Sequence, residues 1–394
     1  MYEYEIRTLQ SLYEEGVFKS SFYKKKLYSK EVFLSYDQFL EISFTYKEEL
    51  RKISAFERTT TPMQDVFGIF SSTGTTGEKT FYVYSKKDKL VHKEFVQELL
   101  GAIGLTANDL GGVMAPLDTG VMAHAMMWQF SAIGAGFVNC PIPSPENMIE
   151  LVKKVPVTVI STRPDIVTSV VYQPEFAKAA KESSVKKLVL GGDFLTEERR
   201  TLLEQTWDAE CYNMFGMSEM FGPMAGECKK KNGLHYINKY LMIEILDPKT
   251  KQPVREGQIG VAVYTTLWDK GFPLLRYWTD DLMRLETAPC GCGSKNPRLF
   301  YIGRLSDHIR VNGASVFPSD VESILFAEGL IGEYKVVQNG EDITVFTEAL
   351  AESVQASVCE KLCALFKRQV GLSVVTPRSL GYLGTKNRFE IKLS

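Results

Sequence analysis

Short apolar segments alternate with helix-like segments from Val66 to about Arg298, and this alternation constrains the fold more than any other feature of the chain. The predicted strands cover 66–70, 111–116, 136–141, 157–161 and 187–192, and the predicted helical stretches cover 88–100, 121–133 and 164–183. Apolar strands that alternate with helices are typical of parallel sheets covered on both faces. Ligands of such sheets bind beyond the carboxyl ends of the strands, so the Gly-rich turns there are predicted to line one site.

The pattern of the sequence changes near Gly303, and at 394 residues the chain exceeds the size of one usual core. Beyond that glycine we predict a helix from Pro318, strands over 334–338 and 343–347, a helix over 351–369 and a final strand. The predicted fold is therefore α/β, with a large N-terminal domain of parallel or mixed sheets over 1–303. A small, mobile α+β domain is predicted over 304–394, and residues 1–60 are predicted to be helical.

The charges of the chain are nearly balanced, with a formal net charge of −2. We therefore expect neither a nucleic-acid partner nor an anionic membrane partner, because no long basic tract is present. The N-terminus lacks the apolar core of a signal peptide, and no apolar run approaches a membrane span. Seven cysteines in such a chain favour a reducing compartment. We expect a soluble cytoplasmic enzyme, with a homodimer left open.

A loop rich in hydroxyl residues and glycine, 71–80, lies between the predicted strands 66–70 and 81–84. Glycines allow a ligand to approach the backbone closely, and hydroxyls with free N–H groups can bind phosphate oxygens. The alternative is an ordinary Ser/Thr/Gly hairpin turn. No glycine directly precedes Lys79, which argues against a Walker loop. The sequence therefore predicts a phosphate loop of another class.

Four further motifs follow this loop in a fixed order. They are Tyr212–Pro223 (YNMFGMSEMFGP), Arg276–Leu282 (RYWTDDL), Gly303–Gly313 (GRLSDHIRVNG) and Ala314–Glu322 (ASVFPSDVE). Together with the loop, their order and spacing resemble the adenylate-forming enzymes, the acyl-CoA synthetases and peptide-synthetase adenylation domains. Within that superfamily the pattern resembles the phenylacetate-CoA ligase family most. The resemblance covers the chain from about residue 60 to its end.

The resemblance implies that a carboxylate attacks the α-phosphate of ATP, giving an acyl adenylate and pyrophosphate, and that a thiol then takes the acyl group. Such chemistry requires Mg²⁺, loop amides and cations around the phosphates. By resemblance, Glu219 is the Mg²⁺ ligand and Ser218 contacts the α-phosphate. The residues that would bind the β- and γ-phosphates are Ser72, Thr73, Gly74, Thr75, Thr76 and Gly77.

The resemblance also implies the rest of the nucleotide site. Asp281 would bind the ribose hydroxyls, and Arg304 the ribose and phosphate region. The residues around the adenine would be Gly191, Gly192, Asp193, Asn213, Phe215 and Gly216. Taken alone, Asp281 reads as a solvated charge or a cap and Arg304 as a surface cation, so these roles depend on the ordered motifs.

Three positions depart from the family pattern. Lys79 stands where the family commonly has a proline, and Ser306 stands at the hinge aspartate. The family's C-terminal lysine aligns without gaps with Thr385, and we assign its role to the neighbouring Lys386. These departures motivate one alternative, a non-catalytic nucleotide-binding protein that has kept the fold.

The acid and the thiol are less constrained. We expect an aryl or arylacetic acid in an apolar pocket lined by His124, Met127, Met214 and Met217, although helical Met residues are more often core. The acceptor thiol is expected to be that of CoA. The alternative is the phosphopantetheine of a carrier protein, loaded by a stand-alone adenylation enzyme.

Cysteine and histidine give a separate signal. Cys228 and His235 lie in one segment, and Cys290 and Cys292 in a Pro-Cys-Gly-Cys-Gly segment far along the chain. Three thiolates and one imidazole suit tetrahedral zinc with no open position, which implies a structural role. The alternative is that these cysteines are free, partly buried thiols. The remaining cysteines lie in apolar contexts and are expected in the core.

Overall fold

The computed structural model describes residues 2–27, 33–72, 79–116, 120–311, 313–380 and 388–392. The chain divides into two compact units, each built from segments far apart in sequence. Unit 1 comprises Met1–Gly104, Asp118–Ala125 and Phe215–Tyr301, and unit 2 comprises Leu105–Leu117, Met126–Met214 and Ile302–Ser394. The domain boundary expected between residues 303 and 304 stays a prediction.

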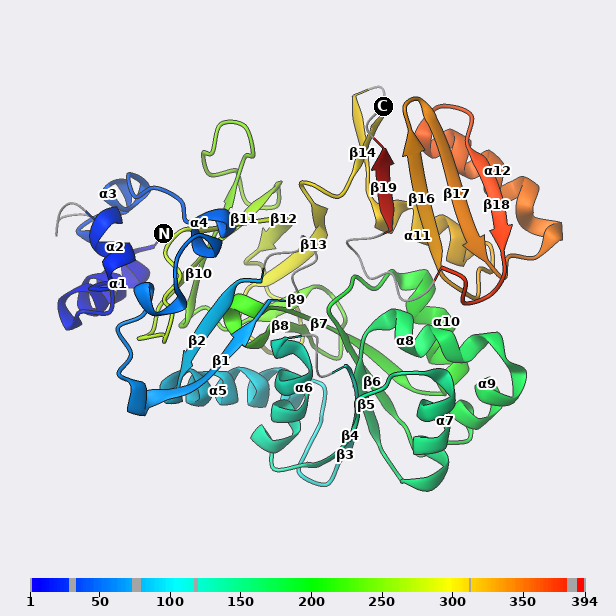
Figure 1. The fold of residues 1–394 in the computed structure, drawn as a ribbon, viewed down its shortest axis with the longest axis horizontal. Helices are drawn as coiled ribbons and strands as arrows, with labels where there is room; N and C mark the ends of the chain where they lie inside the picture. The colour runs from blue at the N-terminus through cyan, green and yellow to red at the C-terminus, as the bar shows by residue number, and fades with distance from the viewer. Residues whose placement is uncertain are drawn as a thin grey trace. The chain divides into compact units, whose positions relative to one another are not determined.

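The described part of residues 1–60, in unit 1, forms helices as predicted (Figure 1). The helices are α1 (Glu3–Glu15), α2 (Ser21–Lys26), α3 (Tyr36–Leu40) and α4 (Lys47–Arg51), followed by the 3₁₀ turns η2 (Ala55–Glu57) and η3 (Met63–Asp65). Serine caps fix two of the helix starts, because the Ser20 and Ser35 hydroxyls accept backbone N–H groups of the first turns of α2 and α3.

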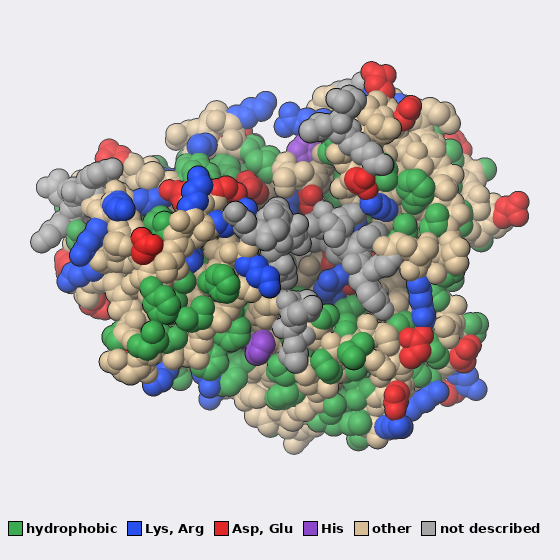
Figure 2. All heavy atoms as spheres, viewed as in Figure 1, with side chains coloured by type: hydrophobic (Ala, Val, Ile, Leu, Met, Phe, Trp, Pro, Cys, Tyr) green, Lys and Arg blue, Asp and Glu red, His purple; other side chains and the backbone are tan. Residues whose placement is uncertain are grey.

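Unit 1 also holds a hairpin and a run of mostly antiparallel strands. The hairpin pairs β1 (Val66–Ser71) with β2 (Phe81–Ser85), and Ser85 caps helix α5 (Lys86–Ala102). The run has the order β10-β11-β12-β13-β9-β8. Its strands are β8 (Gly222–Glu227), β9 (Leu234–Tyr236), β10 (Leu241–Leu246), β11 (Ile259–Thr266), β12 (Tyr277–Glu286) and β13 (Arg298–Arg304). Figure 2 shows hydrophobic side chains over β1 and β2, where Ile69 and Phe81 are exposed.

Unit 2 contains the four parallel strands that the alternating pattern predicted over 111–192, together with β7, which was not predicted as a strand, in the order β7-β6-β5-β3-β4. The strands are β3 (Leu110–Met114), β4 (Gly136–Cys140), β5 (Val159–Thr162), β6 (Lys187–Gly191) and β7 (Glu210–Met217). The helices are α6 (Val121–Ala132), α7 (Pro145–Lys154), α8 (Pro164–Thr168), α9 (Pro174–Lys181) and α10 (Glu197–Trp207), with η4 (Ser169–Tyr172). The helical stretch expected over 164–183 is broken, because Gln173 before Pro174 takes an extended conformation.

The C-terminal part of unit 2 is the α+β arrangement that the sequence predicted. Its elements are β14 (Ile309–Val311), β15 (Ala314–Val316), α11 (Pro318–Ala327), β16 (Tyr334–Asn339), β17 (Asp342–Glu348), α12 (Glu352–Phe366), β18 (Gly371–Val375) and β19 (Phe389–Lys392). Four strands form a sheet in the order β18-β17-β16-β19, and α11 and α12 pack against it around one apolar core (Figure 1). Strand β18 was not predicted.

The parallel strands of unit 2 and the antiparallel strands of unit 1 confirm the predicted mixed α/β class. Over the described part of the chain, no helix is both long and apolar enough to cross a membrane.

Candidate active site

Glu219 lies in the short 3₁₀ turn η5 (Ser218–Met220) that follows β7, and its carboxylate is buried. Its Oε1 atom accepts hydrogen bonds from the hydroxyls of Tyr82 at 2.7 Å and Tyr277 at 2.9 Å. The ammonium of Lys47 lies 3.2 Å from the same oxygen. Burial opposes ionisation of Glu219, but the Lys47 charge and the tyrosine hydroxyls outweigh it and lower its pKa to about 2. Glu219 is therefore an anion at neutral pH.

Lys47 reaches this carboxylate because the segment before α4 pairs with the start of β12. Thr45 donates its N–H to the carbonyl of Arg276 at 2.9 Å and accepts the N–H of Trp278 at 3.0 Å. The Glu49 side chain then accepts the N–H of Tyr46, which closes the first turn of α4. The N-terminal segment thus places the Lys47 ammonium beside Glu219, a residue of the motif in the second half of the chain. Sequence reasoning missed Lys47, and no motif in 1–60 could have found it.

Two tyrosines of the site lie in segments that the sequence predicted, the strand 81–84 and the motif 276–282, but no role was predicted for either of them. Tyr82 lies in β2, directly after the predicted phosphate loop, and Tyr277 begins β12. The contact of Tyr82 with Glu219 connects the strand after the loop to the predicted Mg²⁺ ligand. Four of the five β2 residues are buried in succession, so the pattern of this strand gave no signal of a polar contact at Tyr82.

Ser72, the first predicted phosphate ligand, closes the base of the loop. Its N–H donates to the carbonyl of Thr80 at 2.8 Å, and its hydroxyl accepts the N–H of Thr80 at 3.1 Å. The remaining predicted phosphate ligands, Thr73, Gly74, Thr75, Thr76 and Gly77, lie outside the described residues. Gly120 approaches the same base, since a Cβ atom there would lie 2.1 Å from the Ser71 carbonyl oxygen.

Three predicted nucleotide residues belong to unit 1. Phe215 packs against Tyr301 with ring centroids 5.9 Å apart. Gly216 approaches the backbone of Gly222 so closely that a Cβ atom there would lie 2.3 Å from its carbonyl oxygen. Asp281 is buried in β12, the strand that also carries Tyr277. Asp281, the predicted ribose ligand, and Tyr277, a neighbour of Glu219, therefore lie in one strand.

The other predicted nucleotide residues belong to unit 2. Asn213 on β7 pairs with Leu190 on β6, and Gly191 pairs with Met214. A Cβ atom on Gly191 would lie 2.9 Å from the Met214 carbonyl oxygen, so this position requires glycine. Arg304 ends β13. Whether these residues and those of unit 1 surround one nucleotide stays a prediction.

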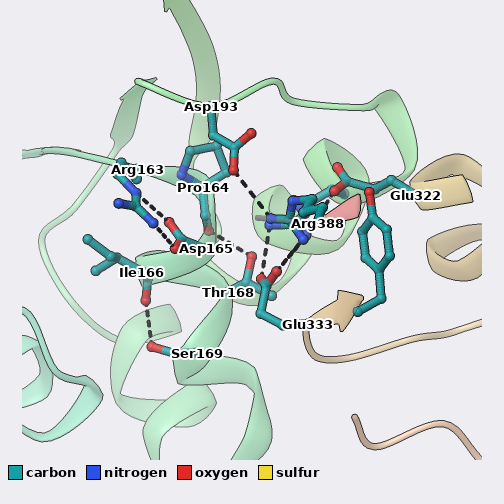
Figure 3. Close-up of polar contacts among 12 residues, drawn as sticks. Arg163, Pro164, Asp165, Ile166, Thr168, Ser169, Asp193, Glu322, Glu333 and Arg388 are labelled. Carbon is teal, nitrogen blue, oxygen red and sulfur yellow. Dashed lines mark hydrogen bonds and ion pairs between the residues drawn. The ribbon is translucent and has the colours of Figure 1, made fainter. Parts of the chain in front are cut away.

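Asp193 follows Gly192, whose φ of +82° favours glycine, and its carboxylate is buried. Burial raises its pKa, and the charge of Arg388 opposes that rise. Figure 3 shows the Asp193 carboxylate facing the guanidinium of Arg388, at 3.3 Å. Lys386 and Thr385, two and three residues before Arg388, lie outside the described residues.

An aromatic cluster next to Glu219 was also missed by sequence reasoning. Phe221, in the left-handed conformation with φ of +67°, packs against Phe70, Tyr84 and His92, with ring centroids 4.9 to 5.5 Å apart. The exposed His124, expected in the acyl pocket, lies 5.1 Å from the ring of Phe70. Met217 belongs to unit 1, and Met127 and Met214 belong to unit 2, so a pocket shared by all four stays a prediction.

The predicted metal ligands lie together in unit 1. The ligand atoms of Cys228, His235, Cys290 and Cys292 all lie within 4.8 Å of one another. The sulfurs of Cys228 and Cys290 are 3.7 Å apart, and Nε2 of His235 lies 3.5 Å from the sulfur of Cys292. The other ring nitrogen of His235 lies 2.9 Å from the carbonyl oxygen of Asn296, which leaves Nε2 for a metal. The donor set and its spacing fit tetrahedral zinc.

The model of the AMP-binding enzyme family matches residues 18–265 of this chain. A phenylacetate-coenzyme A ligase of Thermus thermophilus is 32% identical over 311 residues, which cover 76% of this chain and 68% of that protein. A phenylacetate-coenzyme A ligase of Escherichia coli (strain K12) is 26% identical over 86% of this chain and 82% of that protein.

Solved structures of CoA ligases share the fold. The structure of 2-hydroxyisobutyryl-CoA ligase in the postadenylation state, in complex with 2-HIB-AMP, has a TM-score of 0.85 at 19% identity and covers 98% of this chain and 88% of its own. An anthranilate CoA ligase in complex with anthranoyl-AMP has a TM-score of 0.64 at 16% identity and covers 79% of this chain and 63% of its own.

The ordered motifs, the family model and the Thermus relative agree, and the chain belongs to the AMP-binding enzyme family. More particularly, it is an adenylate-forming acyl-CoA ligase that resembles the phenylacetate-CoA ligases. These findings give no support to the alternative of a non-catalytic protein or to that of a carrier-protein loader.

Proposed function

We propose that this ligase activates an aryl or arylacetic acid with ATP and transfers the acyl group to CoA. A carboxylate oxygen of the acid attacks the α-phosphorus, pyrophosphate leaves, and the CoA sulfur then displaces AMP from the acyl adenylate. The observation that carries the proposal is Glu219, a buried and ionised carboxylate held by Tyr82, Tyr277 and Lys47. The names of the Thermus and Escherichia relatives support the aromatic acid.

The surroundings of Glu219 fit a hard divalent cation and its phosphate ligand. A deprotonated carboxylate is the ligand that Mg²⁺ prefers, and when bound Mg²⁺ would neutralise phosphate charge. Tyr82 and Tyr277 fix the orientation of the carboxylate, and Lys47 adds a cation beside it. We assign the ribose hydroxyls to Asp281, the α-phosphate to Ser218 and the phosphate region to Arg304.

The aromatic cluster around Phe221 supports a flat, apolar acyl group. Phe221 is two residues beyond Glu219, so an acid held against this cluster would have its carboxylate near the phosphates. Aromatic rings pack well against an aryl group through edge-to-face contacts. We assign His124 to the same wall because its ring already packs on Phe70.

We also propose that Cys228, His235, Cys290 and Cys292 bind a structural zinc ion. All four donors are protein side chains, so no position is left for a reacting water. The N–H groups of Lys230 and Ser294 lie 3.4 and 3.5 Å from the sulfurs of Cys228 and Cys292, an arrangement that stabilises thiolates.

Acid-dependent ATP–pyrophosphate exchange, measured over a panel of aryl, arylacetic and short aliphatic acids, tests the function. Exchange with aryl or arylacetic acids and its loss in Glu219→Gln would support it, and thioester formation with CoA but not with a phosphopantetheine carrier protein would fix the acceptor. The paired variants Lys386→Ala and Thr385→Ala show which residue fills the lysine position. Exchange with aliphatic acids alone would contradict the substrate class. Absence of exchange with every acid would contradict the function.

A further inference from the structure

A cavity of about 300 Å³ in unit 1 lies beside the β1–β2 hairpin. Its walls come from the end of α4, the turn η2, the two strands of the hairpin and the residues just before β2. Three of the lining side chains are basic, Arg51, Arg58 and Lys79, and none of the described lining side chains is acidic. The cavity therefore has the size of a small-ligand site and carries positive charge.

This cavity lies on one face of the hairpin, away from Glu219. Ile69 and Phe81 line it, and both are exposed. Phe81 pairs with Ser71, two residues after Ile69, so the two side chains point to the same face. Tyr82 follows Phe81 and points to the other face, where its hydroxyl donates to Glu219. The cavity is therefore separate from the site of the Glu219 carboxylate.

The Arg58 guanidinium is buried without a carboxylate beside it, and the residue is 1% exposed. Its Nη2 donates to the carbonyl of Phe81 and its Nε to that of Ser54 at 3.5 Å, but Nη1 is buried and has no hydrogen-bond partner. The adjacent Glu57 accepts the N–H of Ser54 at 3.1 Å, and no ion pair joins Arg58 to any carboxylate that the structure describes. An arginine keeps its charge in proteins, and a buried charge without a partner is unfavourable. An anion in the cavity would therefore stabilise Arg58.

Arg51 and Lys79 add two further cations to the same cavity. Arg51 ends α4, and its Nε is buried without a hydrogen-bond partner. Lys79 is exposed, and it is the departure from the family pattern to which the proposed function gives no role. Within the described ranges of the chain, neither side chain forms an ion pair. Lys79 also directly precedes Thr80, which lines the cavity and closes the base of the predicted phosphate loop through Ser72. A cavity lined by charges of one sign attracts ions of the other.

We propose that Arg51, Arg58 and Lys79 bind a phosphate group in this cavity, at a site separate from that of the nucleotide. Guanidinium and ammonium groups are the side chains that bind phosphate best. The exposed rings of Phe56 and Phe81 line the same cavity and suit an apolar part of the ligand. Two molecules of the proposed reaction carry a suitable group, namely pyrophosphate and CoA with its 3′-phosphate. The anion site itself does not depend on the proposed function, but its assignment to CoA does.

The test is calorimetry on the full chain, after one equivalent of ATP has filled the nucleotide site in the absence of acid. The probes are inorganic pyrophosphate, CoA, and dephospho-CoA, which lacks the 3′-phosphate. We expect Arg51→Met and Lys79→Met to raise the Kd for pyrophosphate or for CoA about tenfold, because each removes one charged contact. Both side chains are at least partly exposed, so the variants are expected to fold. Arg58 is kept because it also binds the Phe81 carbonyl.

The matched control is Lys52→Met, which makes the same change of charge at an exposed residue next to Arg51 that does not line the cavity. Its Kd values should equal those of the unaltered protein. Weaker binding of pyrophosphate in both cavity variants would identify the product anion as the ligand. Weaker binding of CoA, with dephospho-CoA bound equally by all proteins, would identify the 3′-phosphate.

Equal binding of all three probes by the unaltered protein and both cavity variants would overturn the site. An equal loss of binding in Lys52→Met would overturn it too, because any lysine on this surface would then suffice. Absence of ATP–pyrophosphate exchange with every acid would instead contradict the proposed function and leave the pyrophosphate measurement unaffected.

Discussion

Glu219 carries its charge in a buried position because three donors surround one of its oxygens. A hydrogen bond to a charged group contributes about 1.5–3 kcal/mol, more than one between neutral groups. The two tyrosines and the lysine come from three separate parts of the sequence, so each can be removed separately.

Replacement of Tyr277 by Phe should weaken the enzyme through this carboxylate. With one donor lost, we expect the kcat of ATP–pyrophosphate exchange to fall about tenfold, which is about 1.4 kcal/mol, and the unfolding free energy to fall by about 1–2 kcal/mol. The matched control is Tyr264→Phe in β11, whose hydroxyl donates to the sulfur of Met283 at 3.3 Å. Equal exchange rates in the two variants would refute the role of Tyr277.

Replacement of Lys47 by Met should act on the nucleotide. The site then loses a cation next to the phosphate region, and we expect the Kd for ATP, measured by calorimetry without acid, to rise about tenfold. Lys52→Met, at the other end of α4, is the control because that side chain is exposed. An unchanged Kd in Lys47→Met would show that the lysine serves only to neutralise Glu219.

Sequence reasoning predicted Glu219 and Asp281 as site residues because they lie in motifs that follow one another in a fixed order, and both side chains are buried in the structure. It could not find Lys47, because the partner Glu219 is far away in the sequence. Helix α4 also carries charged residues as any exposed helix does, so its composition gives no signal. The contact of the Tyr172 hydroxyl with Glu348 was missed for the same reason, because the two residues are 176 positions apart in the sequence. Asp193 was assigned to the nucleotide, and the structure adds an ion pair with Arg388 that no local pattern reveals.

At the scale of elements, strands β3, β4, β5 and β6 of unit 2 were predicted to within a few residues because short, mainly apolar segments have few alternatives, whereas β7 was not predicted as a strand. The break of 164–183 into α8, η4 and α9 was not predicted, although Pro174 offered a signal. Strand β18 was missed since it is short and only partly buried, and its pairing with β17 decides its conformation. The proximity of Cys228, His235, Cys290 and Cys292 is the feature that spacing predicted best, because Cys-x-Cys places two thiols close together.

The proposed zinc ion, bound by the Cys₃His cluster, should stabilise unit 1. We expect one zinc ion per chain by mass spectrometry, and in Cys292→Ser we expect loss of zinc together with an unfolding free energy lower by several kcal/mol. Cys359→Ser is the control, since that thiol lies outside the cluster on α12. Zinc content that stays the same in Cys292→Ser, or protein that holds no zinc after growth with it, would contradict the assignment.

At the scale of the whole molecule, unit 2 concentrates buried charge where its C-terminal part packs on residues 163–199. Glu322 belongs to this cluster and lies 3.0 Å from Arg199, with the side chains of both fully buried. Burial raises the pKa of Glu322 to about 7, against the opposing charges of Arg199 and Arg388. The charge pattern therefore links the stability of this unit to pH.

Between about pH 4.5 and 7 the folded protein holds a proton on Glu322 that the unfolded chain releases. The stability that this proton contributes is complete below about pH 4.5 and is lost as the pH rises through 7, by up to about 3 kcal/mol. Glu322→Gln should therefore lose less unfolding free energy than the unaltered protein between pH 5 and 7.5 in chemical denaturation. Glu328→Gln is the control, since this carboxylate lies past the end of α11 and pairs with Lys361 instead of Arg199. If the unfolding free energies of Glu322→Gln and of the unaltered protein changed equally with pH, this prediction would be contradicted.

The pairing of Thr45 with Tyr277 has a consequence for the synthesis of the chain. The Thr45 hydroxyl donates to the carbonyl of Leu275, 230 residues later, so Lys47 cannot take its place until that strand has left the ribosome. At about 5–20 residues per second this delay lasts on the order of 10–50 s. During that time the Tyr- and Phe-rich N-terminal segment lacks its partner strand, so its apolar side chains can be bound by a chaperone.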